Sequence, residues 1–316
     1  MRVMVLEVAT LQTKMGKDYL SMKVRTIDKQ EMAAKIWSFV DGITAGMVVT
    51  GDHKMDSYQG NPHIIFNSLG PDVNQSTAEF EKSSTRDIGL MWIELNNIVE
   101  DMVNPVARII AKELLFDPKI EEAIKRAPAA KGVHNAWFGG LLEHMLSLCS
   151  LAKSVVPHYN NQYNANVDID KVIFGCLVHD LGKTIEYNYK TASFDIAPEG
   201  LLVNHIVLGP AWIYNAAKQS PELAEFECQD EVYQLMHICA AHHGKTEWGS
   251  PVAPTTLEAI LVHHIDNLDA KMMHAIELTK GKEGPVKGFS ERSWFEKVSY
   301  KIQKIFKLTE DNEKGF

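Results

Sequence analysis

Hydrophobic and polar residues alternate along much of the first seventy positions, which is the pattern of half-buried β-strands. Residues 19–25 are the clearest example, because apolar and polar side chains follow one another position by position. Turn-forming residues at 14–18 and 58–62 separate such segments. The expected strands are residues 3–8, 19–25, 31–39, 46–50 and 63–67. Short strands joined by turns predict a small closed barrel over residues 1–70.

The apolar positions follow a helical period from residue 88 onward. The expected helices cover residues 88–103, 106–116, 118–126, 136–155, 170–179, 208–219, 230–243 and 255–278. Residues 71–87 are polar and are expected to form a linker, or else a loop beside the barrel with a short helix. We therefore predict an α+β multidomain fold with a mainly helical domain over residues 88–290 and a C-terminal tail over residues 291–316.

The composition is that of an ordinary globular protein, with 45% hydrophobic and 23% charged residues. The net charge of -9 argues against a surface that coats nucleic acid throughout, but it leaves room for a local basic groove. No apolar run is long enough to span a bilayer, and the N-terminus lacks the features of a signal peptide. The four cysteines are scattered, which is typical of free thiols in a reducing compartment. We expect a cytoplasmic protein without membrane contact.

Histidine and aspartate residues are spread in a regular order over the helical region. For any single one, a core histidine bonded to the backbone is the simpler interpretation, because histidines are often partly buried. The ordered set is better explained by metal binding, since divalent transition metals prefer imidazole nitrogens and carboxylate oxygens. The candidate ligands are His144, His179, Asp180, His205, His242, His243 and Asp266.

Asp180 is the natural bridge in a site for two ions, because its carboxylate has two oxygens. His144, His179 and Asp266 would complete the first site, and His205 with one or both of His242 and His243 the second. Two ions roughly 3.5–4 Å apart clamp the attacking and leaving oxygens of a phosphoryl displacement and activate a shared water as hydroxide. A one-ion site is the alternative, and His205 and His242 decide between the two.

A histidine, a later His-Asp pair and a distant aspartate resemble the HD phosphohydrolase superfamily. The segment from His179 to Lys183, with Gly182 between them, has the usual form of this superfamily. The resemblance implies Asp266 as the last ligand, with Asp269 one helical turn away as the alternative.

Two longer segments are similar to the YhaM family of exoribonucleases. Residues 128–144 look like the start of its catalytic domain, and residues 242–251 form the most specific motif. The barrel followed by a helical domain gives the same domain order, with the barrel resembling an OB-fold. The similarity extends over nearly the whole chain and is weakest in the barrel and after Gly288. It implies Mn²⁺-type hydrolysis of single-stranded RNA from the 3′ end, with some action on single-stranded DNA. The ligand set would also accept Fe, Co, Ni or Zn.

Three residues near these motifs have a catalytic and an ordinary interpretation. Lys183 would neutralise a phosphate oxygen, or it is a solvated lysine at a helix end. His134 would donate a proton to the leaving 3′ oxygen, or it lies in a surface loop. Trp248 would line the substrate path, or it packs against the core; Lys245 beside it is a candidate for RNA contact.

The barrel supplies further candidates for nucleic-acid binding, since OB-folds stack bases on aromatic side chains and track phosphates with basic ones. The alternative is that the aromatic residues fill the core, while the barrel serves assembly of a homo-oligomer. The candidates in this region are Lys14, Lys17, Tyr19, Trp37 and Tyr58.

The function predicted from these features is metal-dependent 3′–5′ exoribonuclease activity. A second enzyme class, a phosphodiesterase or nucleotidase acting on cyclic nucleotides or mononucleotides, would use the same metal site. A third class is a regulatory module with an inactive HD domain, which the complete ligand set disfavours.

Overall fold

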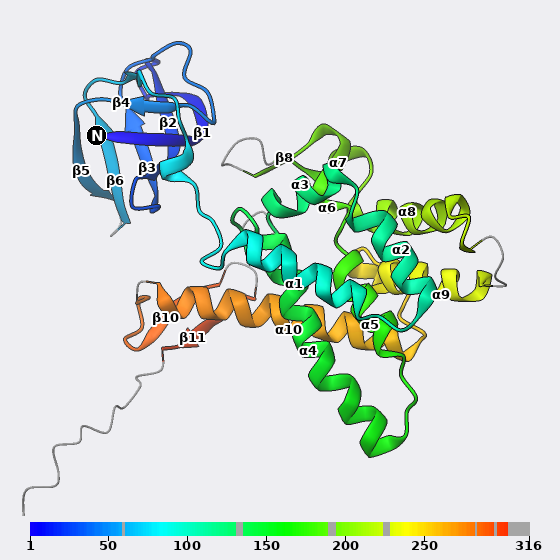
Figure 1. The fold of residues 1–316 in the computed structure, drawn as a ribbon. Helices are drawn as coiled ribbons and strands as arrows, with labels where there is room; N and C mark the ends of the chain where they lie inside the picture. The colour runs from blue at the N-terminus through cyan, green and yellow to red at the C-terminus, as the bar shows by residue number, and fades with distance from the viewer. Residues whose placement is uncertain are drawn as a thin grey trace, which may run out of the picture.

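The computed structural model describes residues 1–58, 61–130, 135–188, 194–223, 228–281, 283–293 and 296–302. Figure 1 shows a β-rich N-terminal unit, drawn in blue, joined by an extended segment to a larger helical unit. The α+β fold class with a β unit followed by a helical domain is therefore confirmed.

The N-terminal unit is one curled sheet with the strand order β5-β6-β3-β2-β1-β4-β7. Neighbouring strands are antiparallel, except that β3 and β6 are parallel. The strands are β1 (Arg2–Gln12), β2 (Asp18–Thr26), β3 (Glu31–Ile36), β4 (Val48–Thr50), β5 (His53–Tyr58), β6 (Asn61–Phe66) and β7 (Gly70–Pro71). The prediction from hydrophobic alternation missed β5, because the described side chains of that strand are exposed and mostly polar.

Only Gly51 and Asp52 join β4 to β5, although these two strands lie near opposite edges of the curled sheet. A Cβ atom on Gly51 would lie 1.9 Å from the carbonyl oxygen of Ser68, so a larger residue does not fit. Apolar side chains from the concave face, including Val5, Val24 and Ile64, form the core of this unit.

The helical unit follows the predicted helices closely in position. Its helices are α1 (Ile88–Glu100), α2 (Pro105–Leu115), α3 (Pro118–Arg126), α4 (Gly140–Tyr163), α5 (Ile169–Val178), α6 (Lys183–Glu186), α7 (Pro198–Leu202), α8 (His205–Gln219), α9 (Gln229–Ala241) and α10 (Leu257–Lys280). Short elements between and around them are η1 (Ala78–Phe80), η3 (Thr246–Trp248), β8 (Tyr187–Asn188) and β9 (Asp195–Ile196). Capping side chains begin several helices, as Asp168 does for α5.

Helix α5 lies in the centre of the helical unit and packs against α4, α9 and α10. Gly175 permits this close packing, because a Cβ atom there would lie 2.5 Å from a methyl carbon of Ile238 and 2.7 Å from one of Val262. The residue after α5 is His179, so the buried helix delivers a polar side chain to the middle of the core.

The segment predicted as a linker is bound to both units. The Gln75 side chain exchanges two hydrogen bonds with the backbone of Val48, and Ser84 N donates to Phe138 O at 2.9 Å. Phe80 belongs to a buried cluster that also contains Met4 from β1 and Phe138 from the loop before α4.

Part of the region predicted as a C-terminal tail forms a hairpin. Strands β10 (Phe289–Arg292) and β11 (Ser299–Lys301) pair next to α10, where His274 Nε2 lies 2.8 Å from Ser293 Oγ. Residues 309–316 lie outside the described residues.

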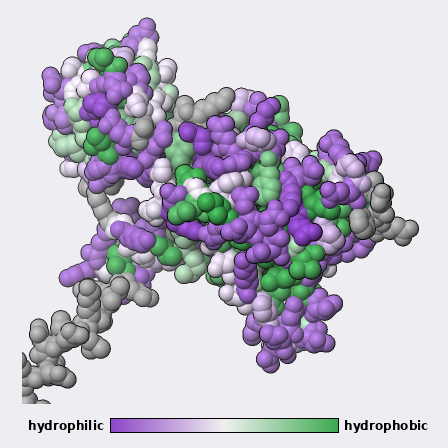
Figure 2. Space-filling model, in the orientation of Figure 1, coloured by the Kyte–Doolittle hydropathy of each residue, from purple (hydrophilic) through white to green (hydrophobic). Residues whose placement is uncertain are grey.

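The visible surface is mostly hydrophilic, with smaller hydrophobic patches on the helical unit (Figure 2). Among the described residues, no helix is long and apolar enough to cross a membrane.

Candidate metal centre

The predicted ligands come together from five helices in the core of the helical unit. Most of them stand at helix ends, where polar side chains can reach a cavity without interrupting an apolar face. The residues are His144 in α4, His179 and Asp180 after α5, His205 at the start of α8, His242 and His243 after α9, and Asp266 in α10.

Asp180 lies between the two groups of histidines, with one carboxylate oxygen toward each. Its Oδ2 atom is 3.3 Å from His179 Nε2. Its Oδ1 atom is 3.5 Å from His205 Nε2 and 3.7 Å from His242 Nε2. This is the arrangement expected of a carboxylate that bridges two cations.

Four buried polar atoms in this cluster have no hydrogen-bond partner among the described residues. Buried polar groups are nearly always paired, so a concentration of unpaired atoms indicates a site that fits a cation. The atoms are His179 Nε2, Asp180 Oδ1, His205 Nε2 and His242 Nε2. The potential metal-donor atoms form two sets, and within each set they lie within 4.8 Å of one another. One set comes from His144, His179 and Asp180, and the other from His205, His242 and His243. The donor types fit a divalent transition metal.

Each histidine in the cluster is oriented by a hydrogen bond from its Nδ1 atom. His179 Nδ1 donates to Gly175 O at 3.0 Å, and His242 Nδ1 donates to Cys239 O at 2.6 Å. His243 Nδ1 donates to Trp248 O at 2.8 Å. These bonds fix the rings so that Nε2 is the atom available to a metal, as is usual for metal-binding histidines.

The two candidate aspartates of α10 have different partners. Asp266 Oδ1 lies 3.1 Å from His144 Nε2 and 3.8 Å from His179 Nε2, inside the cluster. Asp269 Oδ2 lies on the opposite side of the His144 ring, 2.8 Å from His144 Nδ1. The Oδ1 atom of Asp269 accepts a hydrogen bond from the Ser147 hydroxyl. This geometry supports Asp266 as a ligand and gives Asp269 the role of orienting His144.

The protonation states in the cluster also suit metal binding. Burial would raise the pKa of Asp180, but Lys183 and the histidines outweigh it and hold this pKa well below its usual range. Burial, together with the charge of His179, lowers the pKa of His242 well below its usual value. Burial opposes protonation of His144, yet Asp266 and Asp269 raise its pKa to about 9. Anionic carboxylates and neutral imidazoles are the forms that bind metals, so Asp180 and His242 hold the binding form, whereas His144 would release its proton as a metal binds.

Lys183 is buried against the Asp180 carboxylate. Its Nζ atom lies 2.7 Å from Asp180 Oδ2 and 2.7 Å from Ala129 O. The interpretation as a solvated lysine at a helix end is therefore wrong. Lys183 also borders the adjacent cleft.

A cleft of about 640 Å³ opens beside the cluster. Four of the seven candidate metal ligands line this cleft: Asp180, His242, His243 and Asp266. The remaining lining residues are Ala130, Lys183, Trp248, His263, Asn267, Ala270, Lys271, His274 and Glu296.

Two glycines of the recognised motifs are required by close packing at the centre. A Cβ atom on Gly182 would lie 2.6 Å from His205 Cα, so this glycine lets the second group of ligands approach Asp180. Gly244 has a φ of +79°, and a Cβ atom there would lie 2.2 Å from the His263 ring.

Glu186 is a functional residue that the sequence did not reveal. Its Oε2 atom accepts a hydrogen bond from His205 N at 2.7 Å and from His205 Nδ1 at 2.6 Å. Burial would raise the pKa of Glu186, but the hydrogen bonds from His205 and the charge of His205 outweigh burial and lower this pKa. Little in the sequence indicates this role. Glu186 lies one helical turn after Lys183, but its partner His205 follows 19 positions later, so no local pattern links the two.

Glu186→Gln is expected to weaken metal binding at the His205 group by about 10- to 100-fold, the usual cost of losing an outer carboxylate. The amide keeps the shape of the side chain but loses the charge that favours the correct tautomer of His205. Calorimetric titration with Mn²⁺ measures the affinity, and Glu199→Gln on the exposed surface of α7 is the matched control. Equal affinities of both variants would contradict the orienting role.

The candidates for nucleic-acid binding fall on two separate surfaces. The Tyr19 and Trp37 rings lie 5.0 Å apart on the barrel, where Trp37 is 49% exposed. Lys14 and Lys17 are exposed in the adjoining turn between β1 and β2. Lys245 instead belongs to the helical unit, where its Nζ atom lies 4.7 Å from the ring centre of Trp248, a residue that lines the cleft.

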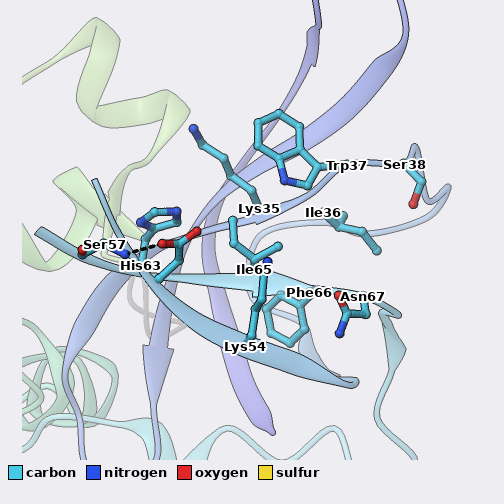
Figure 3. Close-up of a pocket in the computed structure, with 11 residues that line it drawn as sticks. Lys35, Ile36, Trp37, Ser38, Lys54, Ser57, His63, Ile65, Phe66 and Asn67 are labelled. Atoms are coloured by element: carbon cyan, nitrogen blue, oxygen red, sulfur yellow. Dashed lines mark hydrogen bonds between the residues drawn. The ribbon is translucent and has the colours of Figure 1, made fainter. Parts of the chain in front are cut away.

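A second cavity, of about 610 Å³, lies next to Trp37 on the barrel. Figure 3 shows the side chains that line it along β3, β5 and β6, with Lys35 beside Trp37. The side chains of His134 and Tyr58 lie outside the described residues.

A helical domain that gathers a His, a His-Asp pair and a distant Asp around one carboxylate defines a divalent metal-dependent phosphohydrolase of the HD type. The HD domain family matches residues 141–271 of this chain, which include all seven candidate ligands.

The full-length relatives are more specific. The chain is 30% identical over 300 residues to the 3′-5′ exoribonuclease YhaM of Bacillus licheniformis, covering 90% of both proteins. It is 37% identical over 270 residues to YhaM of Bacillus pumilus, covering 81% of this chain and 80% of the relative. It is 34% identical over 291 residues to YhaM of Geobacillus sp., covering 88% and 83%. The chain belongs to the YhaM family. No solved structure matches it.

Proposed function

We propose that the protein is a metal-dependent exoribonuclease that shortens single-stranded RNA from its 3′ end. The observation that carries this proposal is the position of Asp180 among the unpaired Nε2 atoms of His179, His205 and His242, beside a cleft that Asp180 and His242 line. Membership of the YhaM family supports RNA, rather than a cyclic nucleotide or mononucleotide, as the substrate.

The proposed centre holds two divalent ions. His144, His179, Asp180 and Asp266 would bind one, and Asp180, His205, His242 and His243 the other. Mn²⁺ is the metal that the family resemblance suggests, although this donor set also accepts Fe, Co, Ni or Zn. When bound, such ions neutralise a phosphate and lower the pKa of a shared water.

Nearby residues of the chain would contribute charge and protons. Lys183 holds Asp180 in its bridging position, and its buried ammonium adds positive charge at the cleft. His134, in the catalytic motif before α4, is proposed as the proton donor to the leaving 3′ oxygen.

The barrel is proposed to hold RNA upstream of the end that is cleaved. Exposed Trp37 beside Tyr19 offers stacking faces, and Lys14 and Lys17 offer charges for phosphates. Tyr58 completes the proposed set on the barrel, and Lys245 contacts RNA at the cleft. These features would also accept single-stranded DNA, and the barrel is a candidate for assembly into a homo-oligomer. An RNA substrate fits a cytoplasmic location.

A time course on single-stranded RNA labelled at the 5′ end tests the proposal directly. With Mn²⁺ we expect a ladder of labelled products that shortens progressively, and with EDTA we expect intact RNA. RNA labelled at the 3′ end should release a labelled nucleoside monophosphate at the earliest times. Hydrolysis of bis(p-nitrophenyl) phosphate without any shortening of RNA would show an active metal centre with another substrate.

A further inference from the structure

Trp248 is a half-exposed aromatic residue in the wall of the catalytic cleft. Its side chain is 47% exposed, and it lines the same cavity as Asp180, His242 and Asp266. A tryptophan that served only the core would be covered, so packing alone does not explain its position.

The position of Trp248 is fixed relative to the candidate metal ligands. Its carbonyl oxygen accepts the 2.8 Å hydrogen bond from His243 Nδ1. Its ring centre lies 6.1 Å from that of His263, whose Nδ1 atom donates to His242 O at 2.7 Å. Both neighbours of Trp248 are thus bonded to, or part of, the second ligand group.

A positively charged side chain accompanies this aromatic ring. Lys245 Nζ lies 4.7 Å from the Trp248 ring centre, and the Lys245 side chain is 56% exposed. Its ion pair with Glu247, at 3.7 Å on the surface, contributes little stability. The ammonium is therefore available to a phosphate next to the ring.

We propose that Trp248 stacks on a base of the RNA 3′ end and that Lys245 binds the neighbouring phosphate. This rests on the proposed exoribonuclease function. Stacking suits such an enzyme because every base has a π-face, so each new end binds in turn without regard to sequence. Trp248 would thereby set the distance between the terminal nucleotides and the ligands that line the cleft.

The test compares two RNAs that differ only at the 3′ end: one with normal nucleotides, and one whose last two residues lack bases. Binding is measured by fluorescence anisotropy in EDTA, so that RNA stays intact, and KM and kcat are measured with Mn²⁺. The variants are Trp248→Ala and Trp248→Phe, with Tyr163→Ala as the control. Tyr163 is an aromatic residue, 67% exposed, at the far end of α4.

We expect the wild type to bind the normal RNA about 5- to 100-fold more tightly than the abasic RNA, the range of a base–aromatic stack. Trp248→Ala should bind the two RNAs equally and raise KM more than it lowers kcat. Trp248→Phe should retain most of the preference, and Tyr163→Ala all of it. Metal content of each variant shows whether the centre is intact.

The stacking role is overturned if Trp248→Ala, with its metal content unchanged, keeps the wild-type preference for the normal RNA. In that case shortening of RNA by the wild type leaves the exoribonuclease function standing. If the wild type neither binds nor shortens either RNA, the proposed function fails and the stacking role fails with it.

Discussion

Asp180→Asn is expected to lower kcat for RNA shortening by about 10³-fold or more and to remove bound metal. The metal ions supply several kcal/mol of charge stabilisation in such reactions, and each 1.36 kcal/mol corresponds to a factor of ten. Asp180 is the residue whose two oxygens face both groups of ligands, so its loss affects both ions together. An amide offers one neutral oxygen and cannot replace a bridging anion.

The same substitution also leaves a buried charge without its partner. Lys183 Nζ is bonded to Asp180 Oδ2, and removing one member of such a buried pair costs about 3–5 kcal/mol. We therefore expect a lower midpoint of thermal unfolding for Asp180→Asn. The double variant Asp180→Asn, Lys183→Met should recover part of that stability without recovering activity, which separates the fold from the chemistry.

Three measurements check this result: kcat on RNA, metal content by mass spectrometry, and thermal unfolding. Asp101→Asn, at an exposed helix end, is the matched control and should resemble the wild type. An Asp180→Asn protein with full metal content and kcat within tenfold of the wild type would refute the bridging role.

The sequence was sufficient to predict the helical domain and the candidate ligands, for a physical reason. A helix can be predicted from the helical period of its apolar residues. Histidines near the ends of several successive helices form an unusual pattern, which indicates that they act together. His179 illustrates this, since it follows the apolar run of residues 172–178, which belongs to the helix predicted over residues 170–179 and is buried in α5. The sequence identifies Gly182 only as part of a motif. The structure explains why this position is a glycine, because His205 lies against it and leaves no room for a Cβ atom.

Features that depend on contacts between distant segments could not be predicted. Glu186 orients His205 across a loop, and no local pattern connects them. Strand β5 is exposed and polar, so it lacks the alternation that reveals a strand. Helix α4 continues past Pro157 to Tyr163, beyond the predicted end at residue 155, and the Asn160 side chain ties its last turns to Val167.

The two groups of ligands differ in charge, which predicts that they differ in affinity. The first contains Asp266 as well as Asp180, with Asp269 behind His144. The second combines three imidazoles with the shared Asp180, and its only further carboxylate among the described contacts, Glu186, lies behind His205. Because carboxylates attract cations at long range and neutral imidazoles do not, the ion of the second group should be lost first on dilution or chelation.

His205→Ala is therefore expected to leave one ion bound and to lower kcat by about 100-fold or more, since the clamp on the scissile phosphate then acts from one side only. Two ions in the wild type and one in the variant, counted by mass spectrometry after dialysis, would match the proposal. His158→Ala, an exposed histidine on α4, should keep both ions and full activity. If His205→Ala kept two ions, the second group would not need this residue. If it kept one ion and wild-type kcat, a single ion would suffice for catalysis, and the first group alone would be the active centre.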